Sequence, residues 1–254
     1  MSAASVSYAE FQPAAPLNSL VECFWSLELA PGFEAIHHRA FPDGSVDIIV
    51  APGGSIQVSG AMTRSTSWLV SPERKMTGAR LRAGSAPAVL GISATEICDL
   101  VVPLNLLWRS PVRELADRLE TETSHERRIR ILGRFLAAAA EKSGKSAPSS
   151  VAHCVRRLSA PQTRPHFASL AAEFGSGERQ LRRTFEYYVG IGPKRFWRIT
   201  RFQRLLDGMR ARDRTPWADV AQSYGYSDQS HLIREVREFA GEAPTSLLRG
   251  VAHP

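Results

Sequence analysis

The sequence predicts an α+β protein: an N-terminal antiparallel β-barrel with trailing helices, followed by an all-α C-terminal domain with two helix-turn-helix motifs. Three observations predict this fold. A pattern of short helix, turn and second helix occurs twice after residue 166. Short β-like runs separated by turn residues fill residues 20–91, which is typical of a small barrel or sandwich. The charge divides in the same way, because residues 1–145 carry 15 basic and 15 acidic residues, whereas residues 146–254 carry 17 and 10.

The N-terminal part begins with five expected strands. Turn sequences such as Pro42-Asp43-Gly44 and Pro52-Gly53-Gly54 separate them. The strands are residues 21–29, 46–50, 55–60, 66–70 and 76–81.

From Ser93 the pattern turns helical. Ser93 is expected to cap a helix that contains Ile97 and Leu100, Ser110-Pro111 opens a second helix, and Ser124 opens a third. The second and third helices predict a hairpin with an apolar stripe. That stripe either packs on the barrel, which we favour, or pairs two chains as a homodimer.

The segment 143–150 has the composition of a linker, being small, polar and interrupted by Pro148. It divides the chain into an expected sensor or dimerisation domain (1–142) and an expected DNA-binding domain (151–254). Val151 to Leu158 is the expected first helix of the second domain. Because that domain carries the whole net charge of +7, it is the part expected to meet a polyanion.

The repeated pattern covers residues 169–181 and 219–232. Each copy has an alanine where the second helix crosses the first, a glycine that can adopt the left-handed conformation at the turn, and a leucine that anchors the second helix. These residues are Ala171, Gly175 and Leu181 in the first copy and Ala221, Gly225 and Leu232 in the second.

The positions around each anchoring leucine are free to point outward. They carry Arg, Gln and Ser, types that bind base edges in the major groove. Ordinary helical hairpins share this spacing, but two copies with Arg-rich faces favour DNA binding. The candidate base-reading residues are Arg179, Gln180, Arg182, Arg183, Gln229, Ser230, His231 and Arg234.

A helix from Pro193 to Arg212 is expected to connect the two motifs, with Phe196, Ile199, Phe202 and Leu206 on one face. Its length would be roughly 30 Å at ~1.5 Å per residue, close to the ~34 Å between successive major grooves on one face of B-DNA. Four basic residues of this helix are candidate phosphate contacts, although a solvated helix face would also explain two of the four. They are Lys194, Arg195, Arg198 and Arg201.

Residues 225–232 with Gly241-Glu242-Ala243-Pro244, and residues 179–185 with Gly190-Ile191-Gly192-Pro193, resemble the signatures of AraC/XylS-type transcriptional regulators. The resemblance covers about the last third of the chain. It implies a seven-helix domain that binds double-stranded promoter DNA and recruits or blocks RNA polymerase. The sequence departs from the family pattern at Gly177, Val236 and Leu248, which concerns packing rather than function.

Residues 41–50 and 78–84 are similar to the cupin-like sensor domain of one subgroup of these regulators. The resemblance implies a small-molecule effector bound in a mostly apolar pocket with a few polar groups. Core packing is the favoured alternative for the two tryptophans. The candidate pocket residues are Trp25, His38, Asp47, Trp68 and Arg80.

A cupin-type enzyme fused to a DNA-binding domain is the competing interpretation. We expect no metal, cofactor or catalytic site, because adjacent His37 and His38 would point to opposite faces of a strand and no third histidine occurs before His125. The three cysteines have no zinc or redox spacing. No run reaches the ~18 apolar residues of a membrane span. We therefore expect a cytoplasmic protein.

Overall fold

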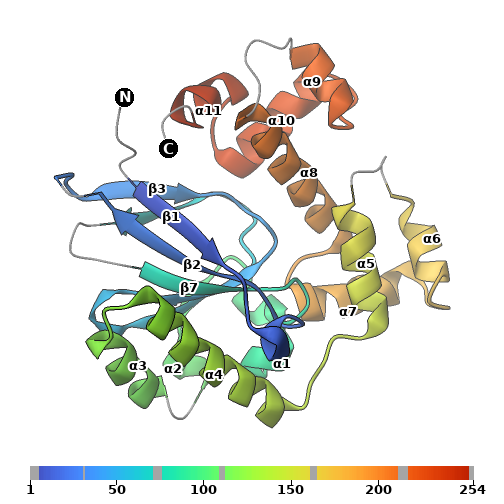
Figure 1. The fold of residues 1–254 in the computed structure, drawn as a ribbon. Helices are drawn as coiled ribbons and strands as arrows, with labels where there is room; N and C mark the ends of the chain where they lie inside the picture. Colours follow the sequence, from blue (N-terminus) through green and yellow to red (C-terminus); the bar gives the residue numbers. More distant parts are fainter. Residues whose placement is uncertain are drawn as a thin grey trace.

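The computed structural model describes residues 6–30, 32–70, 76–108, 112–160, 165–210 and 217–251. Strands come first and helices follow, so the protein is α+β as predicted. Figure 1 shows the strands with helices α1 to α4 as one body and helices α5 to α11 along its side. We call these the N-terminal part and the C-terminal part. The expected helix start at Ser110-Pro111 lies outside the described residues.

A six-stranded antiparallel sheet, in the order β1-β2-β7-β4-β5-β8, forms the framework of the N-terminal part. The predicted runs 21–29, 46–50 and 76–81 are strands over those same residues. The strands of this sheet are β1 (Val6–Phe11), β2 (Val21–Leu29), β4 (Val46–Val50), β5 (Ile56–Ser59), β7 (Met76–Leu81) and β8 (Val101–Pro103).

The remaining two strands, β3 (Ile36–Ala40) and β6 (Thr66–Val70), form a separate antiparallel pair. They pair with each other and not with the edges of the larger sheet. Within the described residues, hydrogen bonding does not join β1 to β8. The sheet is therefore open and does not close into the expected barrel.

The sheet carries a different apolar core on each face, because successive side chains of a strand point to opposite sides. Phe24 and Ile48 belong to the core that the helices of the N-terminal part cover. Their neighbours Trp25 and Ile49 belong to a smaller core that also contains Val70 of β6. The pair β3–β6 thus covers the face opposite to the helices.

Helices α3 (Val112–Thr121) and α4 (His125–Ser143) form the predicted hairpin. Leu115 of α3 and Leu132 of α4 are fully buried in the same core as the inner side chains of the sheet. The favoured interpretation, packing of the hairpin within its own chain, is confirmed. The other short helices of this part are η1 (Ala15–Leu17), η2 (Pro52–Gly54), α1 (Ala86–Leu90), η3 (Ala94–Ile97) and α2 (Leu104–Leu107).

The region after Ser93 differs from the prediction. Ser93 does cap a helical segment, and Glu96 completes the capping box, but η3 ends at Ile97. The chain then enters β8, and Leu100 is 48% exposed instead of lying on a helix. Helical spacing over so few residues cannot be distinguished from a turn that leads into a strand.

The C-terminal part forms seven helices in its described residues, as the family resemblance implied. Aromatic and aliphatic side chains from these helices share one core, in which Phe185, Phe202 and Phe239 are fully buried. The helices are α5 (Ser149–Ser159), α6 (Phe167–Ala172), α7 (Glu178–Val189), α8 (Pro193–Arg210), α9 (Trp217–Ser223), α10 (Gln229–Ala240) and α11 (Pro244–Val251).

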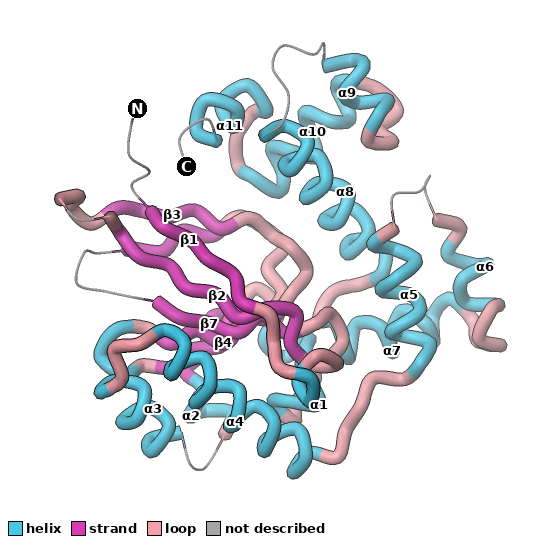
Figure 2. The backbone as a smooth tube through the Cα atoms, in the orientation of Figure 1, coloured by secondary structure: helices cyan, strands magenta, loops and turns pink. Residues whose placement is uncertain are grey.

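The two parts pack directly against each other, and α8 carries much of the contact. The ring of Phe41 lies edge-on to Phe202, with 6.0 Å between ring centroids. The Gln203 amide donates to the Pro42 carbonyl over 2.7 Å. The segment between α4 and α5 is also attached, since Lys145 Nζ donates to the Gly91 carbonyl over 2.7 Å. In Figure 2, loops of the N-terminal part occupy the region between the strands and helices α7 and α8.

Candidate nucleic-acid interface

The first helix-turn-helix consists of α6 and α7. Gly175 adopts the left-handed conformation between them, with φ +60°. Ala171 and Leu181 are buried where the helices meet, and the Ser176 hydroxyl donates to the Ala171 carbonyl over 3.2 Å. Gly177 is the N-cap residue of α7 and offers no side-chain cap. The predicted alanine, glycine and leucine roles are thus confirmed in the first copy.

The outer face of α7 presents the polar residues that the sequence singled out. Arg179, Gln180, Arg182 and Arg183 are all exposed. The Arg182 guanidinium donates to the Glu186 carboxylate one turn later, over 2.7 Å. An exposed pair of this kind is weak and can open when a stronger anion approaches.

The second helix-turn-helix consists of α9 and α10. Gly225 takes φ +73°, and Ala221 and Leu232 are buried at the crossing. Asp228 caps α10, because its carboxylate accepts the His231 backbone N–H over 2.7 Å. That hydrogen bond holds the pKa of the Asp228 carboxyl below its usual value. Asp is among the residues that favour the N-cap position, so the residue type at 228 was the sequence signal for this cap.

Of the four candidate base-reading residues on α10, three are exposed and His231 is partly buried. Gln229, Ser230 and Arg234 are exposed. His231 turns inward: its Nδ1 lies 3.1 Å from Ser227 Oγ, and its Nε2 lies 3.4 Å from Arg201 Nη2. Burial and the nearby Arg201 lower the pKa of this imidazole. The expectation that His231 contacts a base is therefore corrected.

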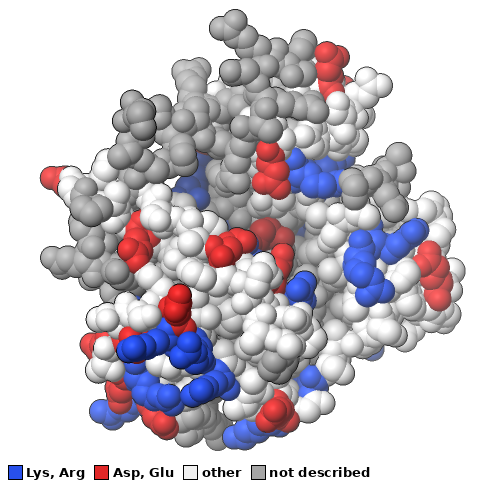
Figure 3. Space-filling model, viewed as in Figure 1, with Lys and Arg blue, Asp and Glu red and all other residues white. Residues whose placement is uncertain are grey.

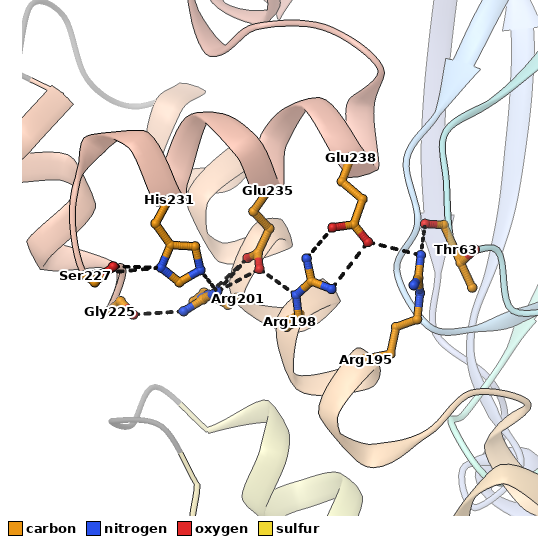
Figure 4. Close-up of polar contacts among 9 residues, drawn as sticks. All are labelled: Thr63, Arg195, Arg198, Arg201, Gly225, Ser227, His231, Glu235 and Glu238. Atoms are coloured by element: carbon orange, nitrogen blue, oxygen red, sulfur yellow. Dashed lines mark hydrogen bonds and ion pairs between the residues drawn. The ribbon is translucent and has the colours of Figure 1, made fainter.

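Arg201 is buried at the junction of α8, α10 and the second turn (Figure 4). Its Nη2 lies 2.7 and 2.8 Å from the two oxygens of the Glu235 carboxylate, and its Nη1 donates to the Gly225 carbonyl over 2.8 Å. The guanidinium also lies over the rings of Tyr226 and Trp197, 4.0 and 4.4 Å from their centroids. With 2% exposure it cannot reach a phosphate, so the predicted phosphate contact is wrong for Arg201. Its chemistry is structural: it holds the second helix-turn-helix on α8.

Arg198 and Arg195 continue the same row of charges toward the N-terminal part (Figure 4). Arg198 Nε donates to Glu235 over 2.7 Å, and its other nitrogens bind Glu238. Arg195 Nη2 lies 3.4 Å from Glu238 and donates to the Thr63 carbonyl over 3.2 Å. Both guanidinium groups bind carboxylates of α10 and are partly exposed, so internal ion pairs compete with their predicted phosphate role.

Lys194 is the remaining candidate from that set, and it is exposed at the start of α8. The space-filling view adds a basic region that the sequence analysis did not select. Figure 3 shows Lys and Arg gathered over α5, and the exposed basic residues of that helix are Arg156 and Arg157. The sequence pattern of α5 predicted only its buried positions. The adjacent residues Arg156 and Arg157 were the sequence signal for this basic region.

The structure brings together three of the five candidate effector residues. Trp25 Nε1 donates to the Asp47 carboxylate over 2.8 Å, and Arg80 Nε lies 3.8 Å from the same oxygen and 3.2 Å from Asp43. Burial raises the pKa of the Asp47 carboxyl to about 7, against the opposing charge of Arg80. The Trp25 ring rests directly on Gly78, where a Cβ would approach to 2.2 Å.

The other two candidates lie on the small sheet that covers this cluster. Trp68 packs against the same apolar core as Trp25, and His38 is its partner in the β3–β6 ladder. Burial lowers the pKa of His38. The burial of Trp25 and the packing of Trp68 agree with the favoured core interpretation of these tryptophans.

A cavity of about 400 Å³ lies elsewhere, between α4 and the start of the chain. None of the five candidate effector residues lines it. Leu17, Phe24 and Ile129 give its wall an apolar part, and two arginines of α4 also line it. The lining residues are Gln12, Ala14, Leu17, Phe24, Glu126, Ile129, Arg130, Gly133, Arg134 and Ala137.

No group of three or more His, Cys, Asp and Glu side chains in the described ranges could hold a metal ion. No described helix is both long enough and apolar enough to cross a membrane. Cys23, Cys98 and Cys154 are free thiols.

Two family models match the sequence. Residues 170–250 match a helix-turn-helix domain of the AraC type, and residues 9–103 match a domain of unknown function, DUF6597. No curated protein sequence matches the chain.

Three solved structures of ToxT from Vibrio cholerae are similar over nearly the whole length. ToxT from strain O395 is 10% identical, covers 98% of this chain and 99% of its own, and has a TM-score of 0.47. A P21 crystal form is 11% identical, with 96% and 98% coverage and a TM-score of 0.46. ToxT bound to a methylnaphthalenyl butenoic acid is 12% identical, with 97% and 99% coverage and a TM-score of 0.45. Residues 170–250 therefore form a helix-turn-helix domain of the AraC type.

Proposed function

We propose that this protein regulates transcription by binding a specific promoter sequence with α7 and α10, its two recognition helices. The observation that carries the proposal is the shared geometry of these helices. Each begins with a turn of exposed polar residues, and each is anchored by a buried leucine. A single chain thereby presents two surfaces of the kind that usually requires a dimer.

The side chains divide into two roles. Arginine binds guanine through two parallel hydrogen bonds and Gln binds adenine, so the exposed residues on α7 and α10 are the base readers. Lys194 contacts phosphate, which adds affinity that falls with salt but carries no sequence information. The base readers are Arg179, Gln180, Arg182, Arg183, Gln229, Ser230 and Arg234.

In this proposal the N-terminal part controls DNA binding. Residues 1–142 form the sensor domain, residues 143–150 the linker, and residues 151–254 the DNA-binding domain. A small-molecule effector binds beside Trp25, Asp47 and Arg80, where an apolar surface carries a partly buried carboxylate and a guanidinium. His38 and Trp68 on the covering sheet complete the site. The protein acts in the cytoplasm, with RNA polymerase and a second copy of the chain as partners, and without catalysis of its own.

Selection of bound duplexes from a random library tests the DNA-binding proposal with the full-length protein. We expect one enriched sequence with two separate boxes, bound with higher affinity than scrambled DNA at every salt concentration. Equal affinity for all duplexes would reduce the protein to a nonspecific DNA binder.

A thermal-shift screen against small metabolites tests the effector site. Any ligand that raises the melting temperature should lose its effect in Asp47→Asn and retain it in Asp117→Asn, a matched change on the exposed face of α3. Equal effects in both variants would place the effector elsewhere, and the cavity beside α4 is then the next site to examine.

A further inference from the structure

Both recognition helices end against the N-terminal part. At the end of α10, the Ser65 backbone N–H donates to the Phe239 carbonyl over 2.8 Å, and the Ser65 hydroxyl donates to the Ala240 carbonyl over 3.2 Å. In the last turn of α7, the Ser93 hydroxyl donates to the Tyr187 carbonyl over 3.3 Å. The last four carbonyls of a helix have no partner within it, so donors from another element fix the direction in which the helix ends.

The segments that carry Ser65 and Ser93 are joined to each other. Asp99 accepts the Thr63 backbone N–H over 2.6 Å and the Thr63 hydroxyl over 2.7 Å. Asp99 holds φ +57°, a left-handed conformation that is uncommon for residues other than Gly and that Asp adopts more readily than most. The Gly60 N–H donates to the Leu100 carbonyl over 2.9 Å, so the backbones of the two segments are also in contact. We call residues 60–65 and 93–100 together the brace.

The brace packs into the C-terminal part as well as donating to it. Ala61 is fully buried in the core of that part. Gly190, which ends α7, lies so close that a Cβ there would be 3.0 Å from the Ala94 carbonyl oxygen and 3.4 Å from Ala61 Cβ. Arg195 of α8 donates to the Thr63 carbonyl over 3.2 Å (Figure 4). The brace therefore touches α7, α8 and α10.

This position matters because of how the two helix-turn-helix units are connected. The helix α8 packs against α5 and α7 and also against α10 and α11. A single helix leaves bending and twisting as ways to change the distance between the two units. The brace supplies a second connection between the ends of α7 and α10, in addition to the connection through α8.

We propose that the brace sets the spacing and the angle between the two recognition helices, and that Ser65, Ser93 and Asp99 are positioning residues for operator recognition. The inference rests on the proposed DNA-binding function and adds a requirement to it. One inserted base pair moves a DNA box by about 3.4 Å and rotates it by about 34° around the duplex. Two helices held in a fixed relation cannot follow that movement, so the protein selects the distance between two boxes as well as their sequences.

The test compares full-length variants on the duplex that the wild-type protein selects from a random library. Affinity is measured for that duplex, for duplexes with one or two base pairs inserted between the boxes, and for a duplex with one box scrambled. Asp99→Gly keeps the left-handed backbone and removes the carboxylate, whereas Asp99→Asn keeps one acceptor. The double variant Ser65→Ala with Ser93→Ala removes both hydroxyl donors. Ser67→Ala is the matched control, since its exposed hydroxyl contacts only His37 among the described residues.

For the wild type, Ser67→Ala and Asp99→Asn, we expect one inserted base pair to reduce affinity at least about tenfold. For Asp99→Gly and the double serine variant, the reduction should fall to within about threefold. Binding to the duplex with a single intact box should be unchanged in all variants. Should Asp99→Gly fail to fold, the double serine variant carries the comparison alone.

Three outcomes would overturn parts of this account, and they can be distinguished. An unchanged insertion penalty in the variants, with specific binding intact, refutes the brace and leaves the DNA-binding proposal standing. Tighter binding of the variants to the original duplex would mean that the contacts inhibit binding, which also refutes the positioning role. Failure of the wild type to select any sequence refutes the proposed function itself.

Discussion

Arg201 and Glu235 form a bidentate ion pair between α8 and α10 in which the two residues are 2% and 1% exposed. The pair joins the connecting helix to the second recognition helix. A buried charge that loses its partner is costly, because the remaining charge has no water to replace it.

Arg201→Met should therefore lower the free energy of unfolding by about 3 kcal/mol, even though Arg198 continues to bind Glu235. Urea unfolding followed by circular dichroism measures the change. Arg182→Met is the control, since it breaks an exposed pair with Glu186 and should leave the free energy of unfolding nearly unchanged. Similar losses in both variants would show that the buried pair is not what holds α10 on α8.

Arg183→Ala and Arg234→Ala should each weaken binding to the selected duplex by about 1–3 kcal/mol and relax the preference at one base position. Lys194→Ala should weaken binding on every sequence and reduce the dependence of log Kd on log salt by about 1. Titrations over a set of single-base variants of the duplex separate the two patterns. Uniform losses for Arg183 or Arg234 would reassign that residue to phosphate.

Asp47 gives the N-terminal part a distinct pH dependence. Its pKa in the folded protein is about 7, above the value of about 4 expected for an unfolded chain. The folded state therefore holds this proton more tightly, and its contribution to stability is complete below pH ~4 and lost as the pH rises to ~7. The charged groups that act on this carboxyl are Arg80, Asp43 and Glu22.

Asp47→Asn should remove the decrease in stability that ionisation of Asp47 causes. The difference in unfolding free energy between wild type and variant should therefore change with pH from 4 to 7. The slope should be at most about 1.4 kcal/mol per pH unit. Denaturation at several pH values measures it, with Asp117→Asn as the exposed control. Parallel curves for wild type and Asp47→Asn would contradict the raised pKa.

Gly44 links the two parts of the molecule through its lack of a side chain. It has φ +79°, and a Cβ at this position would approach the Phe196 ring of α8 to 2.9 Å. Gly32 has a similar φ of +87° and no atom within 4 Å of the Cβ position. Both alanine substitutions strain the backbone, but only Gly44→Ala adds a clash between the parts.

Gly44→Ala should therefore cost about 1–3 kcal/mol more than Gly32→Ala. Thermal unfolding compares the two, and hydrogen exchange at α8 should increase only in Gly44→Ala. Equal losses in both variants would mean that the Phe196 ring moves aside freely.

Local patterns predicted much of this structure. Strands β2, β4, β6 and β7 begin and end where alternation and turn residues placed them, and both turns of the helix-turn-helix units use the predicted glycines. These features depend on neighbouring residues, and the sequence contains that information directly. The exposed residues at the start of α7 were predicted for the same reason.

Features that depend on distant partners were missed. From its neighbours in the sequence, Arg201 is predicted to be a surface cation. Its burial depends on Glu235, which lies 34 residues later in the chain. The edge strands β1 and β8 were missed because neither shows an alternation of buried and exposed residues. Each is a strand only through its pairing with a neighbour, β2 or β5. His231 shows the same limit, because its inward orientation depends on Arg201 and Ser227 together.

The close packing of Phe41 and Gly44 on Phe202 and Phe196 has a practical consequence for work on the DNA-binding half. A truncated protein that starts at α5 would expose the Phe202 and Phe196 rings to water on this side. Such exposure would not arise in a regulator whose two halves were joined by a linker without packing together. We therefore expect such a fragment to aggregate unless the exposed aromatic surface is redesigned. Crystallisation with operator DNA should begin from the intact polypeptide.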